Sequence, residues 1–237
     1  MDFSFYTTTF MALLGGVPLT LKLAFGATAI GAVLALGLAL ARLSGLRLLD
    51  WPARAYVFVF RGSPLLVQIF LIYYGLGQFK ALRFSVLWPF LREPYWCALL
   101  ALTLNTAAYA SEVIRGGLLA VPPGEIEAGR ACGMSRGLLF RRIVLPQAIR
   151  QALPGYGNEL VSMVKATSLA SIITLMEVTG IAARIISESY RVTEVFVLAG
   201  AIYLAINFAI TRALAWLEYR LTPHLRTGPA APLPLAD

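Results

Sequence analysis

The first long apolar stretch of this chain is VPLTLKLAFGATAIGAVLALGLALA, residues 17–41, in which Lys22 is the only charged residue. A bilayer core needs about 20 apolar residues in helical form, so this stretch is long enough to cross it. Hydrophobic residues make up 59% of the 237 residues and charged residues only 14%, whereas a soluble domain carries about 25% charged residues. The mean hydropathy of +0.74 agrees with this imbalance. The sequence therefore predicts an all-helical integral membrane protein.

Further apolar stretches follow the first and predict four more transmembrane helices, at about residues 55–77, 95–110, 153–176 and 195–217. The second of the five spans is interrupted by Arg61-Gly62-Ser63-Pro64, a helix break that membrane proteins tolerate when neighbouring groups satisfy the freed backbone. We expect Arg61 to anchor this break or the cytoplasmic end of the second span, rather than to bind a ligand. Five spans would place the two ends of the chain on opposite sides of the membrane.

The charge distribution predicts which side each end occupies. The chain carries 20 Lys and Arg against 12 Asp and Glu, a net charge of +8. Its arginines concentrate between spans one and two, between spans three and four, and after span five, which predicts an outer N-terminus and a cytoplasmic C-terminus. The positive charge then needs no nucleic-acid partner. Residues 1–222 are predicted to form one domain, and the Pro- and Ala-rich residues 223–237 a disordered cytoplasmic tail.

The connection between spans three and four, residues 121–152, is too long and too patterned for a simple loop. It predicts two short helices joined by a left-handed turn at Gly133, with Ser135 as the N-cap of the second. The second helix is expected to run to Leu145, where Pro146 interrupts it. Such an amphipathic segment either lies on the lipid surface, with its arginines reaching the phosphates, or docks into another protein.

The residues of this connection resemble a known signature. Glu127-Ala128-Gly129 is followed by three residues, Gly133, nine residues and Ile143-Val144-Leu145-Pro146. This spacing resembles the EAA loop of bacterial ABC-importer permeases, with Gly129 in place of the usual second alanine. Three more stretches resemble the polar amino-acid branch of that family, its histidine/octopine/nopaline type above all: residues 60–68, 105–117 and 165–171. The resemblance covers about residues 10–220.

The resemblance implies the type I ABC-importer permease fold, in a homo- or heterodimer with a second permease chain in the bacterial inner membrane. It also implies an ATPase dimer docked on the EAA loop and a periplasmic substrate-binding protein. The residues that it assigns to ATPase coupling are Glu127, Ala128, Arg130, Gly133, Leu145 and Pro146. None of the three lysines lies in a P-loop signature, so ATP and magnesium are expected on the partner ATPase, and no cofactor or metal on this chain.

Polar residues inside the predicted spans are candidates for a substrate site, because placing them in lipid is costly. Glu159 is the strongest candidate, since its carboxylate suits an ammonium or guanidinium group. The other candidates are Asn158, Ser162, Asn105, Tyr109, Glu112 and Gln68. Each has a structural alternative. Asparagines join helices, tyrosines anchor at membrane interfaces, and glutamates form structural ion pairs.

Three other functions compete with an importer subunit. A stand-alone secondary transporter would show internal symmetry or an ion path of its own, and neither is evident. A membrane-embedded enzyme would need a nucleophile with a base, or metal ligands, and the only histidine is His224 in the tail. A scaffold protein would not explain the glutamate and lysine within span four. The sequence therefore favours a permease for polar or basic amino acids or opines.

Overall fold

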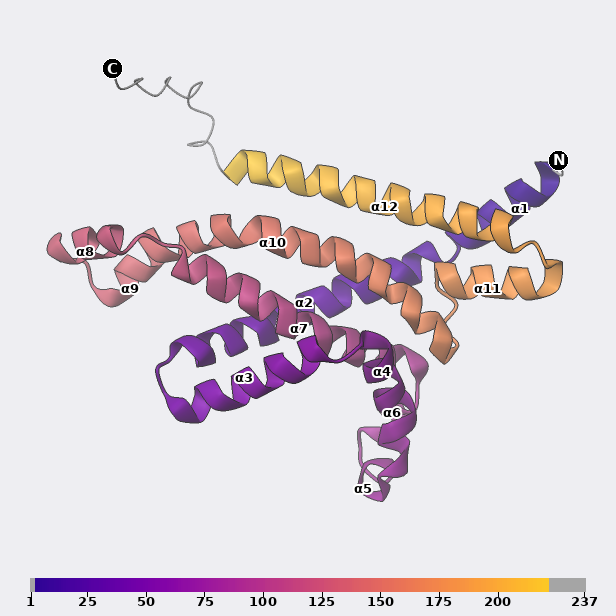
Figure 1. The fold of residues 1–237 in the computed structure, drawn as a ribbon, viewed down its shortest axis with the longest axis horizontal. Coiled ribbons are helices and arrows are strands. Elements are labelled where there is room, and N and C mark those ends of the chain that lie inside the picture. Colours follow the sequence, from indigo (N-terminus) through magenta and orange to yellow (C-terminus); the bar gives the residue numbers. More distant parts are fainter. Residues whose placement is uncertain (1–2, 222–237) are drawn as a thin grey trace, which may run out of the picture.

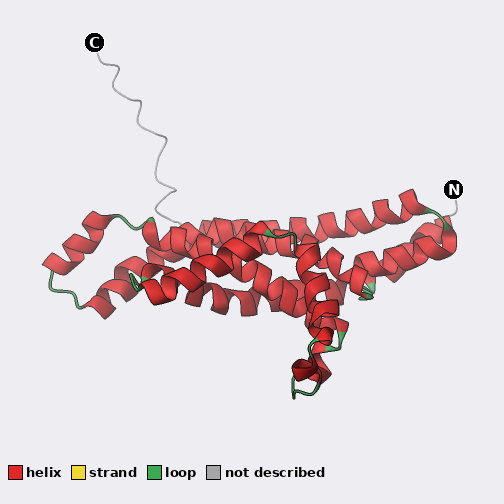
Figure 2. Ribbon diagram, turned by 60° about the horizontal axis from the view of Figure 1, so that its bottom comes forward, coloured by secondary structure: helices red, strands yellow, loops and turns green. Residues whose placement is uncertain are grey.

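The computed structural model describes residues 3–221, so the tail predicted at 223–237 lies outside the described residues. The prediction of an all-helical protein is confirmed, since Figure 2 shows helices joined by short loops and no strand in the described part of the chain. The helices run in the order α1 Phe3–Leu14, α2 Val17–Leu43, α3 Arg47–Gly62, α4 Leu65–Phe70, η1 Leu71–Gly75, η2 Leu76–Gln78, α5 Lys80–Arg83, α6 Trp88–Leu91, α7 Pro94–Leu119, α8 Pro123–Ala131, α9 Arg136–Leu139, η3 Phe140–Val144, α10 Leu145–Ala166, η4 Thr167–Ile173, α11 Val178–Ser189 and α12 Val192–Leu221.

Three helical segments are long and apolar enough to cross a membrane, namely Phe3–Leu43, Pro94–Leu119 and Val192–Leu221. Two bent pairs raise the number to five if each counts as one span. The first pair joins Arg47–Gly62 to Leu65–Gln78 with a bend of 106°, and the second joins Arg136–Ile173 to Val178–Ser189 with a bend of 47°. In Figure 1 the start of α1 and the end of α12 lie at opposite ends of the bundle.

Helices α2 and α7 form the centre of the bundle, because small side chains let their backbones approach closely. Ala24, Ala27, Ala98 and Ala101 are fully buried in their contact. A Cβ atom on Gly31 of α2 would lie 2.4 Å from the Cγ2 atom of a threonine on α7, so only glycine fits there. This packing fixes the position of α7, which carries several of the predicted site residues.

The connection between α7 and α10 differs from its prediction. Gly133 does end α8 with a φ of +75°, and the Ser135 side chain does accept the N–H of Leu138 as an N-cap. The predicted break at Pro146 is wrong, because the chain is helical from Arg136 through Ala166. A π-turn precedes Pro146 and shifts the hydrogen-bond register by one residue, which accommodates the missing proline N–H.

This continuity gives the molecule its shape. Figure 1 shows α8 and α9 at one end of the bundle and α11 at the other, with α10 running between them. The short helices α5 and α6 project from the side of the bundle in both views (Figures 1 and 2). We call the end that carries α8 the coupling end.

At the end opposite α8, a fully buried carboxylate holds the bend before α11. Glu177 caps α11 by accepting the backbone N–H of Gly180 at 2.8 Å. It also accepts hydrogen bonds from the hydroxyl groups of Tyr203 on α12, at 2.5 Å, and Thr20 on α2, at 3.3 Å. One side chain thus joins three membrane helices. No motif in the sequence indicates this role for Glu177.

Replacing Glu177 by alanine is expected to destabilise the assembled complex. The loss leaves the buried N–H of Gly180 and the buried hydroxyl of Thr20 without their acceptor, while the hydroxyl of Tyr203 keeps Thr179 as a partner. Each unsatisfied group costs about 1–3 kcal/mol. A thermal melt of the purified complex should show the midpoint lowered by several degrees. Glu188→Ala, on the exposed face of the same helix, is the control and should leave the midpoint unchanged. Equal midpoints for the two variants would contradict the role of Glu177.

Candidate functional site

The break between α3 and α4 is the feature around which the site is built. Ser63 and Pro64 have extended backbone conformations, which the proline imposes on the residue before it. The carbonyl groups that the break frees are satisfied by one side chain, since Nε2 of Gln68 donates to the carbonyl oxygen of Phe60 at 2.9 Å and to that of Ser63 at 3.1 Å. Gln68 is buried, so its side chain stabilises the break and does not face an open cavity.

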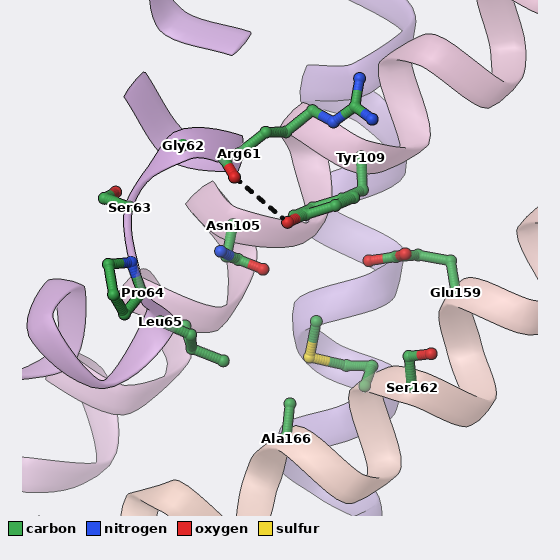
Figure 3. Close-up of a pocket in the computed structure, with 11 residues that line it drawn as sticks. Arg61, Gly62, Ser63, Pro64, Leu65, Asn105, Tyr109, Glu159, Ser162 and Ala166 are labelled. Atoms are coloured by element: carbon green, nitrogen blue, oxygen red, sulfur yellow. Dashed lines mark hydrogen bonds between the residues drawn. The ribbon is translucent and has the colours of Figure 1, made fainter. Parts of the chain in front are cut away.

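Asn105 of α7 completes this arrangement. Its Nδ2 atom donates to Oε1 of Gln68 at 3.0 Å and to the carbonyl oxygen of Phe60 at 3.4 Å. The two amides therefore link the broken segment to the central helix α7. Figure 3 shows the amide oxygen of Asn105 on the side of the open space between α7 and α10.

That open space is a cavity of about 560 Å³ (Figure 3). Helix α3 and its break supply one wall, α7 the second and α10 the third. The lining residues are Arg61, Gly62, Ser63, Pro64, Leu65, Asn105, Tyr109, Glu159, Ser162, Met163 and Ala166. The cavity thus combines one carboxylate and one guanidinium with several neutral polar groups.

The two charged side chains reach the cavity from different helices. Thr106 of α7 donates its hydroxyl to Oε1 of Glu159 at 2.9 Å, which directs the carboxylate from α10 towards α7. The guanidinium carbon of Arg61 lies 5.2 Å from the ring centre of Tyr109, a distance at which cations and aromatic faces attract. Within residues 3–221 the guanidinium of Arg61 forms no salt bridge. A ligand with both a cationic and an anionic group would find a partner for each.

Four of the seven predicted substrate residues line this cavity, namely Glu159, Ser162, Asn105 and Tyr109. The other three do not. Gln68 is buried behind the break, and Asn158 points to the opposite side of α10, where it lines a separate space against α12. Glu112 lies nearer the coupling end and forms ion pairs with Arg42 and Arg115.

The residues predicted to couple to an ATPase lie at the coupling end. Glu127, Ala128 and Arg130 are on the exposed side of α8, and Gly133 forms the turn that follows it. Leu145 and Pro146 lie in the first turn of α10 and so belong to the span rather than to the projecting part.

Helix α8 is held firmly against that span. Gly129 is buried, and a Cβ atom on it would lie 2.4 Å from Cδ1 of Leu139, so this glycine lets α8 pack close to the start of the next helix. The side chain of Gln147 in α10 donates a hydrogen bond to Glu125 of α8. These contacts join α8 to α10, which carries Glu159.

Comparison with known proteins places this arrangement in a family. The family described as "Binding-protein-dependent transport system inner membrane component" matches residues 27–223. The chain belongs to this family. It is a permease subunit of an ABC transporter, and ATP hydrolysis is carried out by a separate ATPase subunit.

Several relatives resemble the permease over nearly its whole length. It is 64% identical over 233 residues to the octopine transport system permease protein OccM of Rhizobium meliloti, covering 98% of this chain and 95% of the relative. It is 54% identical to the nopaline transport system permease protein NocM of Agrobacterium fabrum, covering 98% of each chain. The histidine/lysine/arginine/ornithine permease HisM of Escherichia coli is 38% identical, with 89% of each chain covered.

Solved structures give the same result for the fold of the permease. The crystal structure of an amino acid ABC transporter with histidines matches with a TM-score of 0.82 and 35% identity, over 93% of this chain and 99% of that one. The MetNI methionine ABC transporter, in an inward-facing form, matches with a TM-score of 0.73 at 20% identity, over 90% and 97%, which shows the fold.

The structure gives two residues of the permease positions that the sequence did not indicate. Arg61 was expected to anchor the break or the end of the span, and the structure places it among the residues that line the cavity, with its guanidinium over the ring of Tyr109. Its position directly before Gly62-Ser63-Pro64 was the available signal, since a broken helix in a transporter often borders the site. Glu177 had a weaker signal, because nothing in the sequence shows that Thr20 and Tyr203 meet it.

Proposed function

We propose that the permease transports arginine-like amino acids and the opines derived from them, through the cavity between α3, α7 and α10. The opposed charges of Glu159 and Arg61 support this substrate class. A guanidinium or ammonium group would pair with Glu159, and a carboxylate with Arg61. The relatives named for octopine, nopaline, arginine and histidine support it as well, since octopine and nopaline are carboxyalkyl derivatives of arginine.

Asn105, Ser162 and Tyr109 have subsidiary roles in this proposal. Asn105 and Ser162 offer neutral hydrogen-bonding groups, and Tyr109 holds the guanidinium of Arg61 at the wall. Gln68 is a positioning residue that keeps the break in shape. Asn158 and Glu112 take no part in this cavity.

The assembly follows from the family. We propose that residues 1–222 act as one domain in the bacterial inner membrane, surrounded by lipid, with the N-terminus outside and the coupling end in the cytoplasm. A second permease chain, identical or different, completes the pathway, an ATPase dimer docks on α8, and a periplasmic binding protein delivers the substrate. ATP and magnesium bind to the ATPase, and this chain holds no cofactor.

Transport then proceeds by movement of rigid segments. Closure of the ATPase dimer moves α8, and its contacts with α9 and α10 transmit the movement to the membrane helices. Access to the cavity alternates because the ATPase has different affinities for the two arrangements. The bend at Gly62-Ser63-Pro64 keeps the site near the middle of the membrane during this exchange.

Reconstitution of the complete complex in proteoliposomes tests the proposed function. With the binding protein outside and ATP inside, we expect uptake of radiolabelled octopine or arginine, and background uptake of an acidic amino acid such as glutamate. Uptake should need both ATP and the ATPase subunit. Uptake that is driven by an ion gradient without the ATPase would instead support a secondary transporter.

A further inference from the structure

A second cavity of about 540 Å³ lies beside the first, towards the coupling end. The two cavities share Arg61, Gly62 and Tyr109 as a common wall. Helices α2, α3 and α7 supply the other lining residues, which are Arg42, Arg54, Val57, Phe58 and Glu112. A ligand in the first cavity that extended past Arg61 would enter the second.

The second cavity has more cations than anions. Arg42, Arg54 and Arg61 line it, and Glu112 is its only acidic lining residue. Glu112 is itself shared, because it pairs with Arg42 and with Arg115, whose Nη2 atom lies 2.8 Å from Oε2 of the glutamate. Asp50 pairs with Arg54, so two carboxylates face the guanidinium groups of Arg42, Arg54, Arg61 and Arg115, and positive charge remains in excess.

The arginines also have hydrogen-bond donors to spare. Only Nε of Arg54 is used by Asp50, at 2.7 Å, and the arginine side chain is 62% exposed. Nε of Arg42 is buried and has no hydrogen-bond partner in the part of the chain that the structure describes. A guanidinium presents five N–H donors in a planar fork that matches a carboxylate.

We propose that this second cavity is a carboxylate subsite, which binds the additional carboxylate of an N-carboxyalkyl amino acid. The inference rests on the proposed function and extends it. The guanidinium of such a ligand pairs with Glu159, its α-carboxylate with Arg61, and its second carboxylate with Arg42 and Arg54. Free arginine has no second carboxylate to pair with Arg42 and Arg54, so the subsite favours opines over the parent amino acid.

The phosphate of a lipid headgroup is also an anion that a pair of arginines can bind. Arginines near the ends of membrane helices commonly contact such headgroups. The position of Arg42 and Arg54 favours the substrate. Both line one cavity with Tyr109, in continuity with the site that holds Glu159, and the side chain of Arg42 is only 15% exposed. The experiment below separates the two sources by the lipid supplied.

The test measures direct binding to the permease complex, without the binding protein, so that the specificity of that protein does not enter. The complex is placed in nanodiscs of phosphatidylcholine, and the dissociation constants of octopine and arginine are measured by calorimetry. In Arg54→Gln we expect octopine to bind at least about tenfold more weakly, because a charge-assisted hydrogen bond is lost, and arginine to bind within twofold of wild type. The dissociation constant of octopine for Arg54→Lys should lie between those for the wild type and for Arg54→Gln, because lysine keeps the positive charge but lacks the planar fork of N–H donors.

Arg47→Gln is the matched control, because Arg47 begins the same helix and lines neither cavity. It should leave both constants unchanged. Equal weakening of octopine and arginine by Arg54→Gln, or none, would overturn the subsite while leaving the proposed function in place. An effect that appears only in nanodiscs with anionic lipid would overturn it in favour of a lipid site. A wild-type complex that binds neither compound would overturn the proposed function itself.

Discussion

In Glu127→Lys, ATP-driven uptake by the assembled complex should fall at least about 100-fold, because a like charge placed against a basic partner costs several kcal/mol. Glu127 lies on the exposed side of α8, at the coupling end, where a docked ATPase would meet it. Its carboxylate makes no contact that the fold requires, so the variant should still assemble. Uptake and substrate-stimulated ATP hydrolysis in proteoliposomes are the two measurements.

Two further variants sharpen this prediction. Glu127→Gln removes the charge without reversing it and should show an intermediate loss. Glu188→Lys reverses an exposed acid on α11, at the opposite end of the bundle, and should transport normally. If Glu127→Lys keeps its uptake and its stimulated ATPase activity, Glu127 does not couple the two subunits.

The second large effect is expected for Glu159→Gln, which removes the only acidic side chain among the described residues that line the cavity. The affinity for guanidinium and ammonium substrates should fall about 10- to 100-fold, because hydrogen bonds to charged groups contribute about 1.5–3 kcal/mol. The glutamine can still accept the hydroxyl of Thr106, so the helix contact survives. Uptake kinetics of arginine and octopine in the complete complex provide the measurement.

Glu93→Gln serves as the control for this loss. Glu93 precedes α7, has a side chain that is 55% exposed and lies outside the cavity lining. Its variant should transport as wild type does. Unchanged kinetics for every cationic amino acid in Glu159→Gln would remove Glu159 from the substrate site.

Hydropathy predicted where apolar helices lie but misjudged where some of these helices end. The third span was predicted to end at residue 110, just before Ser111 and Glu112, yet α7 continues to Leu119. The helix continues because the carboxylate of Glu112 pairs with Arg42 and Arg115, which removes the penalty that the polar residues implied. Such a pairing between helices is invisible to a hydropathy window.

The helix that carries the fourth predicted span begins before that span. The span was predicted from about residue 153, whereas α10 begins at Leu145. The π-turn before Pro146 absorbs the missing N–H. The predictions from residues with a specific local conformation are confirmed, since Gly133 forms the left-handed turn and Ser135 the N-cap.

The candidate site was only partly predictable from periodicity. Glu159 and Ser162 share a helix face, and both line the cavity. Asn158 and Ser162 are also one turn apart, yet Asn158 faces α12. Periodicity shows which residues lie on one side of a helix, but not which neighbouring helix that side meets.

The sequence by itself determined the class of the protein, because composition and apolar length dictate a membrane environment and the spacing from Glu127 to Pro146 indicates the family. The tertiary structure alone decided which polar groups face one another. Arg61, Asn105 and Glu159 come from three helices, and the packing of α3 and α10 against α7 brings them to one cavity. The buried cluster of Glu177, Thr20 and Tyr203 has the same origin. In each case the partners lie far apart along the chain, so only the packing of the helices brings their charges and hydrogen bonds together.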